Sequence, residues 1–167
     1  MVSRRDVLLT GGSAAIAGLA GCSAVLGGGS GTDSGLHLDT VDVAGSPGGS
    51  IPVNPSNEVV LLDFWATWCA PCKPQMAELR QLRQTFPDLH MLSITNETDI
   101  DAIKSFWRTY EGTWPVATDP DLETNERFGV RRIPTLIVLD AAGTEQWRHV
   151  GLAAAESIAH ALREAGV

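Results

Sequence analysis

The chain has 167 residues, enough for one domain with a proper hydrophobic core and an additional tail. Acidic residues outnumber basic ones, 20 to 12, which argues against a nucleic acid as a partner. Ten of the twelve basic residues are arginine, and a dispersed acidic surface with so little lysine indicates a protein from a high-salt environment. An ordinary acidic surface that keeps the protein soluble is the alternative.

The first 21 residues have the pattern of an export signal. The pair Arg4-Arg5 precedes a weakly apolar run, residues 11–21, that is too short and too rich in Gly and Ala for a membrane span. The segment ends in Leu19-Ala-Gly-Cys22, and it resembles a twin-arginine (Tat) signal joined to a lipobox. This resemblance implies cleavage before Cys22 and attachment of a lipid to its sulfur. The alternative is an uncleaved N-terminal anchor, or ordinary cleavage that leaves Cys22 as a free thiol.

A tether and a hairpin are expected between this signal and the main body of the chain. Residues 22–35 are rich in Gly and Ser and cannot bury a core, so they predict a flexible linker ahead of a domain at 36–167. Residues 36–43 alternate apolar and polar side chains with one slip, which predicts a strand with a bulge. After a turn at 44–50, residues 51–53 predict a short strand, placed at a sheet edge because its proline lacks an N–H donor.

Residues 59–76 are the segment around which we interpret the rest of the chain. Residues 59–65 form an apolar run rich in β-formers, too short for an independent helix, and they predict a buried strand. Cys69 follows at the expected start of a helix, where free backbone N–H groups and the helix dipole stabilise a thiolate and lower the thiol pKa. Cys72, three positions later on the same helical face, can close a disulfide with Cys69. Two thiols in this arrangement predict a redox couple.

The remainder of the chain alternates between helical and extended patterns. Helices are expected at 71–86, 99–110, 122–128 and 153–165. The inward face of the second of these is expected to carry Ile100, Ile103, Phe106 and Trp107. Strands are expected at 89–95, 114–118, 135–139 and 145–150, with a hairpin turn at 141–143. This alternation predicts an α/β protein with a mixed sheet.

Two separated motifs resemble a known family. The segment Asp63-Phe-Trp-Ala-Thr-Trp-Cys-Ala-Pro-Cys72 resembles the active site of thioredoxins, and more closely that of the membrane-tethered thioredoxin-like reductases of the TlpA/ResA type. The similarity resumes at Arg127-Phe-Gly-Val-Arg-Arg-Ile-Pro-Thr-Leu-Ile-Val-Leu139, which resembles the segment that carries the cis-proline of that fold. The resemblance implies a thioredoxin fold with an N-terminal β-hairpin and a helix–strand insertion. One departure is Ala77, where the family usually has a helix-kinking proline; Pro74 stands nearby instead.

The motif assigns a role to three residues of the redox chemistry. Cys69 is the expected attacking thiolate, and Cys72 is the thiol that resolves the mixed disulfide. Asp63 is a carboxylate within an apolar strand, and burial would raise its pKa and let it exchange a proton with Cys72. It matches the buried aspartate of thioredoxin. The alternative is an aspartate at the strand end that finds water or a backbone N–H.

The resemblance also implies a substrate-facing surface beside the cysteines. Trp68 is expected on this surface, with Trp65 packed beneath it. The backbone at Ile133 is expected to pair with an extended substrate segment, and Pro134 to follow a cis peptide bond opposite the dithiol. The two residues between the cysteines, Ala70 and Pro71, complete the binding candidates and include no His, which favours a reductant over a strong oxidant.

Together these features predict a thiol–disulfide oxidoreductase of thioredoxin fold that needs no cofactor or metal. By resemblance it is a monomer, anchored by lipid to the extracytoplasmic face of the membrane, that reduces disulfides in exported proteins. Apocytochrome c is one candidate substrate, and the electrons would come from a dithiol donor in the membrane.

Three other uses of the cysteine pair remain open. Half of a zinc site or a static disulfide is one, although zinc needs two further ligands and no two His stand at paired spacing. A thiol peroxidase is another, but the peroxiredoxin pattern has a threonine where this chain has Ala66. The last is a copper or haem chaperone, whose copper-delivering relatives have three residues between the cysteines instead of two.

Overall fold

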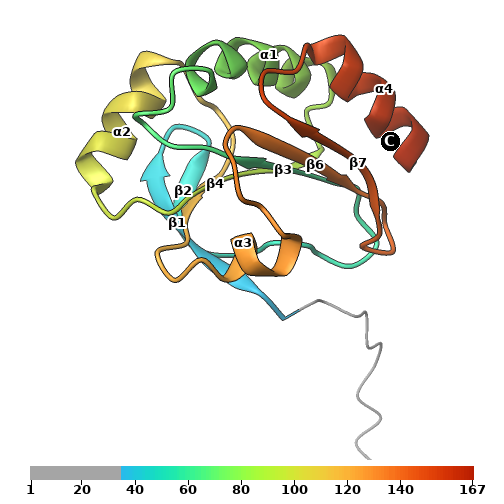
Figure 1. The fold of residues 1–167 in the computed structure, drawn as a ribbon, viewed down its shortest axis with the longest axis horizontal. Coiled ribbons are helices and arrows are strands. Elements are labelled where there is room, and N and C mark those ends of the chain that lie inside the picture. Colours follow the sequence, from blue (N-terminus) through green and yellow to red (C-terminus); the bar gives the residue numbers. More distant parts are fainter. Residues whose placement is uncertain (1–34) are drawn as a thin grey trace, which may run out of the picture.

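The computed structural model describes residues 35–167, which form a seven-stranded mixed sheet with helices on both faces (Figure 1). The strands are β1 (His37–Val43), β2 (Ser46–Pro52), β3 (Val60–Phe64), β4 (His90–Thr95), β5 (Val116–Thr118), β6 (Thr135–Leu139) and β7 (Glu145–Val150). The helices are α1 (Cys72–Thr85), α2 (Ile100–Thr109), α3 (Glu123–Phe128) and α4 (Ala155–Ala165). The predicted export signal and Cys22 lie outside the described residues.

The sheet has the strand order β2-β1-β5-β4-β3-β6-β7, so β3 lies near its centre. Strand β3 runs parallel to β4 and antiparallel to β6, and the sheet is therefore mixed, as predicted. Helices α1, α2 and α4 cover one face and α3 covers the other (Figure 1). Because both faces are covered, all five residues of β3 are buried, which explains its continuous apolar run. The predicted bounds of β6 and β7 agree with the structure.

The predicted insertion, α2 followed by β5, joins the N-terminal hairpin to the rest of the sheet. Strand β5 pairs in parallel with β4 on one side and antiparallel with β1 on the other. Asp99 caps α2, since its carboxylate accepts a hydrogen bond from the N–H of Ala102. Ile100, however, is 40% exposed rather than inward, because it is the first residue of α2 and precedes the turn that packs on the sheet.

The hairpin differs from the prediction in two respects. The turn is Ala44-Gly45 alone, and the Gly-rich residues 46–50 belong to β2, where they pair with β1. A side chain at Gly45 would collide with the backbone of Thr113, and its φ of +75° suits only glycine well. The bulge is also absent, because the register with β1 is continuous. The slip in the pattern arises because Leu38 and Val41 enter the cores on opposite faces.

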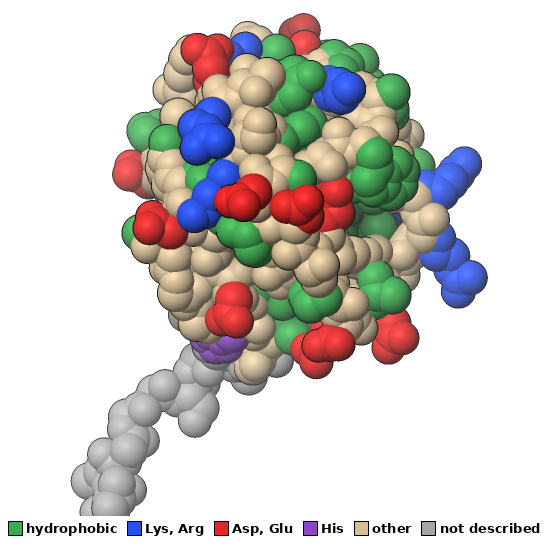
Figure 2. Space-filling view, turned by 90° about the vertical axis from the view of Figure 1, so that its left-hand side faces the viewer, with side chains coloured by type: hydrophobic (Ala, Val, Ile, Leu, Met, Phe, Trp, Pro, Cys, Tyr) green, Lys and Arg blue, Asp and Glu red, His purple; other side chains and the backbone are tan. Residues whose placement is uncertain are grey.

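Acidic side chains are scattered over the side of the molecule that faces left in Figure 1, intermixed with a few basic ones (Figure 2). Among residues 35–167, no helix has both the length and the apolar composition that crossing a bilayer requires.

Candidate active site

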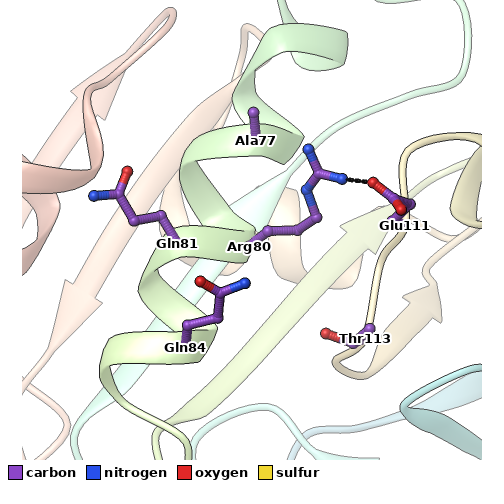
Figure 3. Close-up of a pocket in the computed structure, with 6 residues that line it drawn as sticks. All are labelled: Ala77, Arg80, Gln81, Gln84, Glu111 and Thr113. Atoms are coloured by element: carbon purple, nitrogen blue, oxygen red, sulfur yellow. Dashed lines mark hydrogen bonds and ion pairs between the residues drawn. The ribbon is translucent and has the colours of Figure 1, made fainter.

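Cavity size alone does not locate the reactive centre. A cavity of about 520 Å³ lies between α1 and the segment after α2 (Figure 3), where Arg80 and Glu111 form an ion pair. A second, of about 560 Å³, lies near the start of β3 and β4 and is lined in part by Val59 and His90. Neither is lined by a cysteine. The site must therefore be built from the chemistry of the residues that follow β3.

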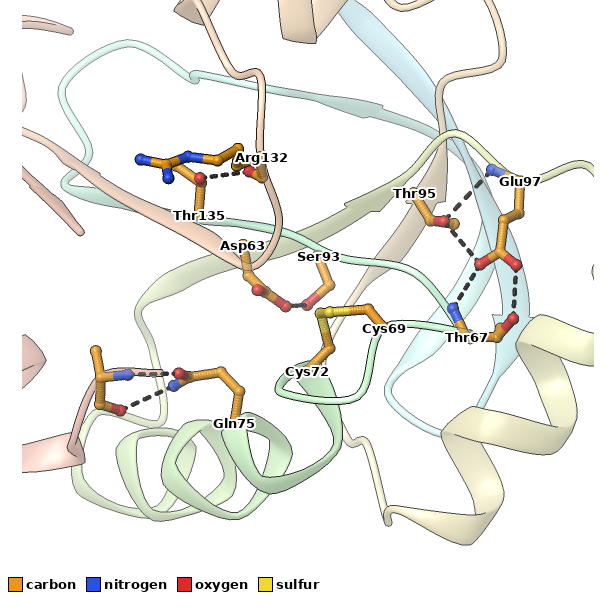
Figure 4. Close-up of a disulfide and its surroundings, with 11 residues drawn as sticks. Asp63, Thr67, Cys69, Cys72, Gln75, Ser93, Thr95, Glu97, Arg132 and Thr135 are labelled. Carbon is orange, nitrogen blue, oxygen red and sulfur yellow. Dashed lines mark hydrogen bonds between the residues drawn. A yellow bond between two sulfur atoms is a disulfide. The ribbon is translucent and has the colours of Figure 1, made fainter. Parts of the chain in front are cut away.

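The two cysteines lie where β3 gives way to α1, and they are joined in a disulfide with a Cα–Cα separation of 5.3 Å (Figure 4). Helix α1 begins at Cys72, with Pro71 as its N-cap. Cys69 was predicted at the helix N-terminus, but it lies in the turn that precedes the helix. Its carbonyl accepts a hydrogen bond from the N–H of Cys72 at 3.2 Å. Both cysteines are buried, whereas Ala70 and Pro71 between them are exposed.

A carboxylate from the next loop holds the segment that leads to Cys69. One oxygen of Glu97 accepts a hydrogen bond from the N–H of Thr67 at 2.7 Å, and the other accepts one from the Thr67 hydroxyl at 2.6 Å (Figure 4). The Thr95 hydroxyl donates to the same carboxylate at 3.1 Å. The sequence analysis missed this contact, because Thr67 and Glu97 are 30 residues apart and no local sequence pattern indicates that the two residues pair.

Asp63 is buried on the face of the sheet that carries α1. Its carboxylate oxygen Oδ2 accepts a hydrogen bond of 2.7 Å from the hydroxyl of Ser93 on β4 (Figure 4). Burial raises the pKa of Asp63 to about 7, and the Ser93 hydrogen bond partly opposes that rise by stabilising the charged form. The raised pKa agrees with the prediction, and it allows the carboxyl group to gain or lose a proton near neutral pH.

The predicted substrate-facing residues gather at one end of the sheet. The Ile133–Pro134 peptide bond is cis, as the resemblance implies. Trp68 is 73% exposed, while Trp65 is buried. A cavity of about 180 Å³ is lined by Trp68 and Ile133, together with Trp65, Glu97 and several neighbours, so the structure brings these two candidates together. Ala70 and Pro71 do not line it.

Gln75 is a further residue that the sequence analysis missed. Its side chain is buried and makes two hydrogen bonds with the backbone of Ala153: the amide donates to the carbonyl at 3.1 Å, and its oxygen accepts from the N–H at 2.8 Å (Figure 4). Glu78, on the next turn of α1, accepts a hydrogen bond from the N–H of Ala155 at the start of α4. These contacts fix the helix that begins with Cys72 against the segment before α4.

The described residues contain no group of three or more His, Cys, Asp or Glu side chains that could hold a metal ion. The arrangement is instead one of an exposed aromatic residue, a closed cysteine pair and a buried carboxyl group, all near the start of α1. Such a set can exchange a disulfide and move a proton.

Comparison with known proteins places the chain in a family. The sequence profile described as Redoxin matches residues 52–162. The chain belongs to the Redoxin family. The matched segment begins at the end of β2 and includes both cysteines, Asp63 and Pro134.

Relatives of known name match about half of this Redoxin chain. It is 34% identical over 96 residues to the thioredoxin-like protein YneN of Bacillus subtilis, covering 55% of this chain and 56% of the relative. It is 36% identical over 87 residues to the thiol-disulfide oxidoreductase ResA of Bacillus thuringiensis, covering 50% of each. The chain thus matches about half the length of these curated relatives.

Solved structures confirm the fold. StoA from Bacillus subtilis superposes with a TM-score of 0.65 at 20% identity, covering 75% of this chain and 94% of StoA. DsbF of Mycobacterium tuberculosis superposes with a TM-score of 0.68 at 19% identity, covering 78% and 94%. The Redoxin chain therefore has the thioredoxin-like fold that the motifs implied.

Proposed function

We propose that this Redoxin-family chain is a thiol–disulfide oxidoreductase whose reactive group is the Cys69–Cys72 pair. The observation that carries the proposal is the closed disulfide at the start of α1, on the same sheet face as the buried carboxyl group of Asp63. The relatives named thiol-disulfide oxidoreductases support it, since they are more than 30% identical to this chain over about half of its length.

The reaction follows from the positions of these groups. In the reduced protein, the Cys69 thiolate attacks one sulfur of a substrate disulfide, so that a mixed disulfide forms and a substrate thiolate leaves. The Cys72 thiol then gives its proton to the Asp63 carboxylate and attacks the sulfur of Cys69. The bond to the substrate breaks, and the second substrate thiolate leaves. Two electrons have passed to the substrate, and the protein is left with the disulfide that the structure shows.

The substrate is a disulfide-containing protein segment that lies across Trp68 and pairs with the backbone at Ile133. The large exposed indole of Trp68 and the adjoining cavity support this placement. Ala70 and Pro71, exposed between the cysteines, and Pro134, which follows the cis peptide bond, complete the proposed binding surface. The absence of a His between the cysteines supports a reducing role, in which the chain is reduced again by a membrane dithiol.

The chain acts outside the cytoplasm, held to the membrane by a lipid on Cys22. The twin-arginine segment and the Leu-Ala-Gly-Cys motif support this location. Two of the similar solved structures are described in the same terms, one as a secreted disulfide oxidoreductase and one as an exposed lipoprotein thioredoxin. Exported proteins, apocytochrome c among them, are then the substrates, and the chain acts as a monomer.

Disulfide exchange by the Cys69→Ser variant tests the proposal. The variant should lose the activity towards a peptide disulfide, because no thiolate remains to attack; retention of full activity would refute it. The reduction potential of the pair decides the direction of transfer. A value near or below about −250 mV supports a reductant, while a value near about −120 mV makes the chain a disulfide donor.

A further inference from the structure

Two consecutive hydrogen bonds, from Trp114 to Ser93 and from Ser93 to Asp63, lead to the buried carboxyl group of Asp63. The Ser93 hydroxyl donates to Oδ2 of Asp63 at 2.7 Å, and its oxygen accepts a hydrogen bond from the indole Nε1–H of Trp114 at 2.9 Å. All three side chains are inside the protein, with exposures of 3% for Asp63, 0% for Ser93 and 1% for Trp114. Since the indole can only donate, the hydroxyl hydrogen of Ser93 is directed towards Asp63.

The hydrogen-bonded side chains lie on the same face of the sheet as the cysteines. Asp63 and Ser93 are directly opposite each other in the register of β3 and β4. Leu61 and Trp65, the alternate neighbours of Asp63, belong to the same core cluster as Cys69 and Cys72. Figure 4 shows the Asp63–Ser93 pair beside the disulfide. The other oxygen of Asp63, Oδ1, has no hydrogen-bond partner among the described residues, so it can accept a proton.

The electrostatic environment of Asp63 is simple. Burial raises its pKa and the Ser93 hydrogen bond lowers it, with no contribution from a charged side chain. Among the buried residues of α1, α2, α4 and the core cluster on this face, the cysteines are the only acid or base; Glu78, half-buried on α1, is bonded to the N–H of Ala155 at the start of α4. Ser93 therefore supplies the hydrogen bond that stabilises the carboxylate where no cation does, and Trp114 donates in turn to the Ser93 hydroxyl.

We propose that Ser93 and Trp114 are positioning residues for the proton transfer from Cys72 to Asp63. Ser93 holds Oδ2, which leaves Oδ1 to receive the thiol proton, and Trp114 fixes the direction of the Ser93 hydroxyl. The Ser93 hydrogen bond keeps about half of the Asp63 carboxyl groups ionised, and hence able to take the proton, at pH 7. This inference rests on the proposed oxidoreductase function and adds two residues to its machinery.

The resolving step can be followed directly with Ellman's reagent, in the full chain carrying Cys22→Ser. Cys69 of the reduced protein releases one thionitrobenzoate ion, and attack by Cys72 on the resulting mixed disulfide releases a second in a phase independent of reagent concentration. Its rate constant should rise with pH, with a midpoint near 7 set by Asp63.

Ser93→Ala should move that midpoint upward by about one pH unit, the lower end of the range of about one to two pKa units that a hydrogen bond to a charged group is worth. A carboxyl group half ionised at pH 7 would become about one-tenth ionised, so the rate at pH 7 should fall about five-fold while the rate at pH 9 is nearly unchanged. Trp114→Phe should shift the midpoint in the same direction by less, because the hydroxyl remains but is free to turn away.

The matched control is Ser46→Ala. Ser46 is a buried serine that accepts a hydrogen bond from the N–H of Val116, and its loss should leave the midpoint unchanged. Ser93→Thr keeps a hydroxyl and should restore the wild-type midpoint. In an Asp63→Asn background, Ser93→Ala should produce no further shift, because the group on which it acts is gone.

Titration of the Asp63 carboxyl carbon by NMR, in the oxidised protein, separates this inference from the proposed function. A higher pKa in Ser93→Ala together with the shifted rate profile would support the positioning role. An unchanged carboxyl pKa, or a rate lowered equally at every pH, would overturn it. Failure of the proposed oxidoreductase function would give a different result, namely full disulfide-exchange activity in the Cys69→Ser variant.

Discussion

Asp63→Asn should make the oxidised protein more stable, and increasingly so as the pH rises. The carboxyl group has a pKa of about 7 in the folded protein, against an ordinary value of 3.8 that we take for the unfolded chain. A folded-state pKa above the unfolded one gives stability that is complete below pH 3.8 and is lost as the pH rises through 7. The full loss is about 4 kcal/mol, at 1.36 kcal/mol for each unit of difference. Between pH 5 and pH 8, the loss is about 2.6 kcal/mol.

The assay is urea unfolding of wild type and Asp63→Asn with the disulfide intact, at intervals from pH 5 to pH 8. Subtracting the two free energies of unfolding cancels the titration of groups that both proteins share, so the difference should widen by about 2–3 kcal/mol in favour of the variant. Asp140→Asn is the control: turn hydrogen bonds lower the pKa of Asp140, so it is ionised in both states and its difference should stay flat. A flat or narrowing difference for Asp63→Asn would refute the reasoning.

Three further substitutions test other parts of the site. Gln75→Ala should lower the free energy of unfolding by about 1–3 kcal/mol in urea, because both backbone groups of Ala153 lose their partner; an unchanged midpoint would contradict this. Trp68→Ala should change stability by less than about 0.5 kcal/mol, yet slow the reaction with a peptide disulfide more than with glutathione disulfide; equal slowing would argue against a peptide-binding role. Glu97→Gln should slow the first thionitrobenzoate release, since Thr67 loses a charged acceptor, and an unchanged rate would count against the anchoring role.

Local patterns were enough to predict the elements that carry the chemistry. The run before Asp63 has the composition of a strand buried on both faces, and the spacing of Cys69 and Cys72 allows a disulfide at a helix start. Strand β7 follows a Gly-containing turn and could be placed from that signal. In each case the determining residues lie within a few positions of one another.

The contacts that tune the site could not be predicted in this way. Ser93 is 30 residues from Asp63, and Gln75 is 78 residues from Ala153. The sequence around Ser93 or Gln75 does not indicate the residue to which each bonds. These pairs are determined only when the strands and helices assemble. Trp114 was predicted as a strand residue, but it precedes β5, and its indole donates to the hydroxyl that bonds to Asp63.

The hairpin shows the opposite error, in which local composition is overruled. Residues 46–50 contain the Pro, Gly and Ser that usually mark a turn, and yet they form most of β2 because β1 offers a continuous line of pairing partners. Pairing in the assembled sheet, rather than propensity, decides the conformation there.

The same composition affects how molecules of this protein meet one another. Strand β2 forms one edge of the sheet, and such an edge can recruit a strand from another chain and start aggregation. Backbone N–H groups of a strand point alternately towards the paired strand and away from it, so only one of Pro47 and Pro52, which are five positions apart, removes a donor from the free edge. Gly48 and Gly49 add φ angles of +78° and +84°, which ordinary strand residues do not adopt. Charged side chains at an edge repel another chain less in concentrated salt, because the ions screen the charges. The effect of a missing N–H donor does not involve charge screening and is unchanged by salt. This part of the protection against self-association therefore does not depend on ionic strength.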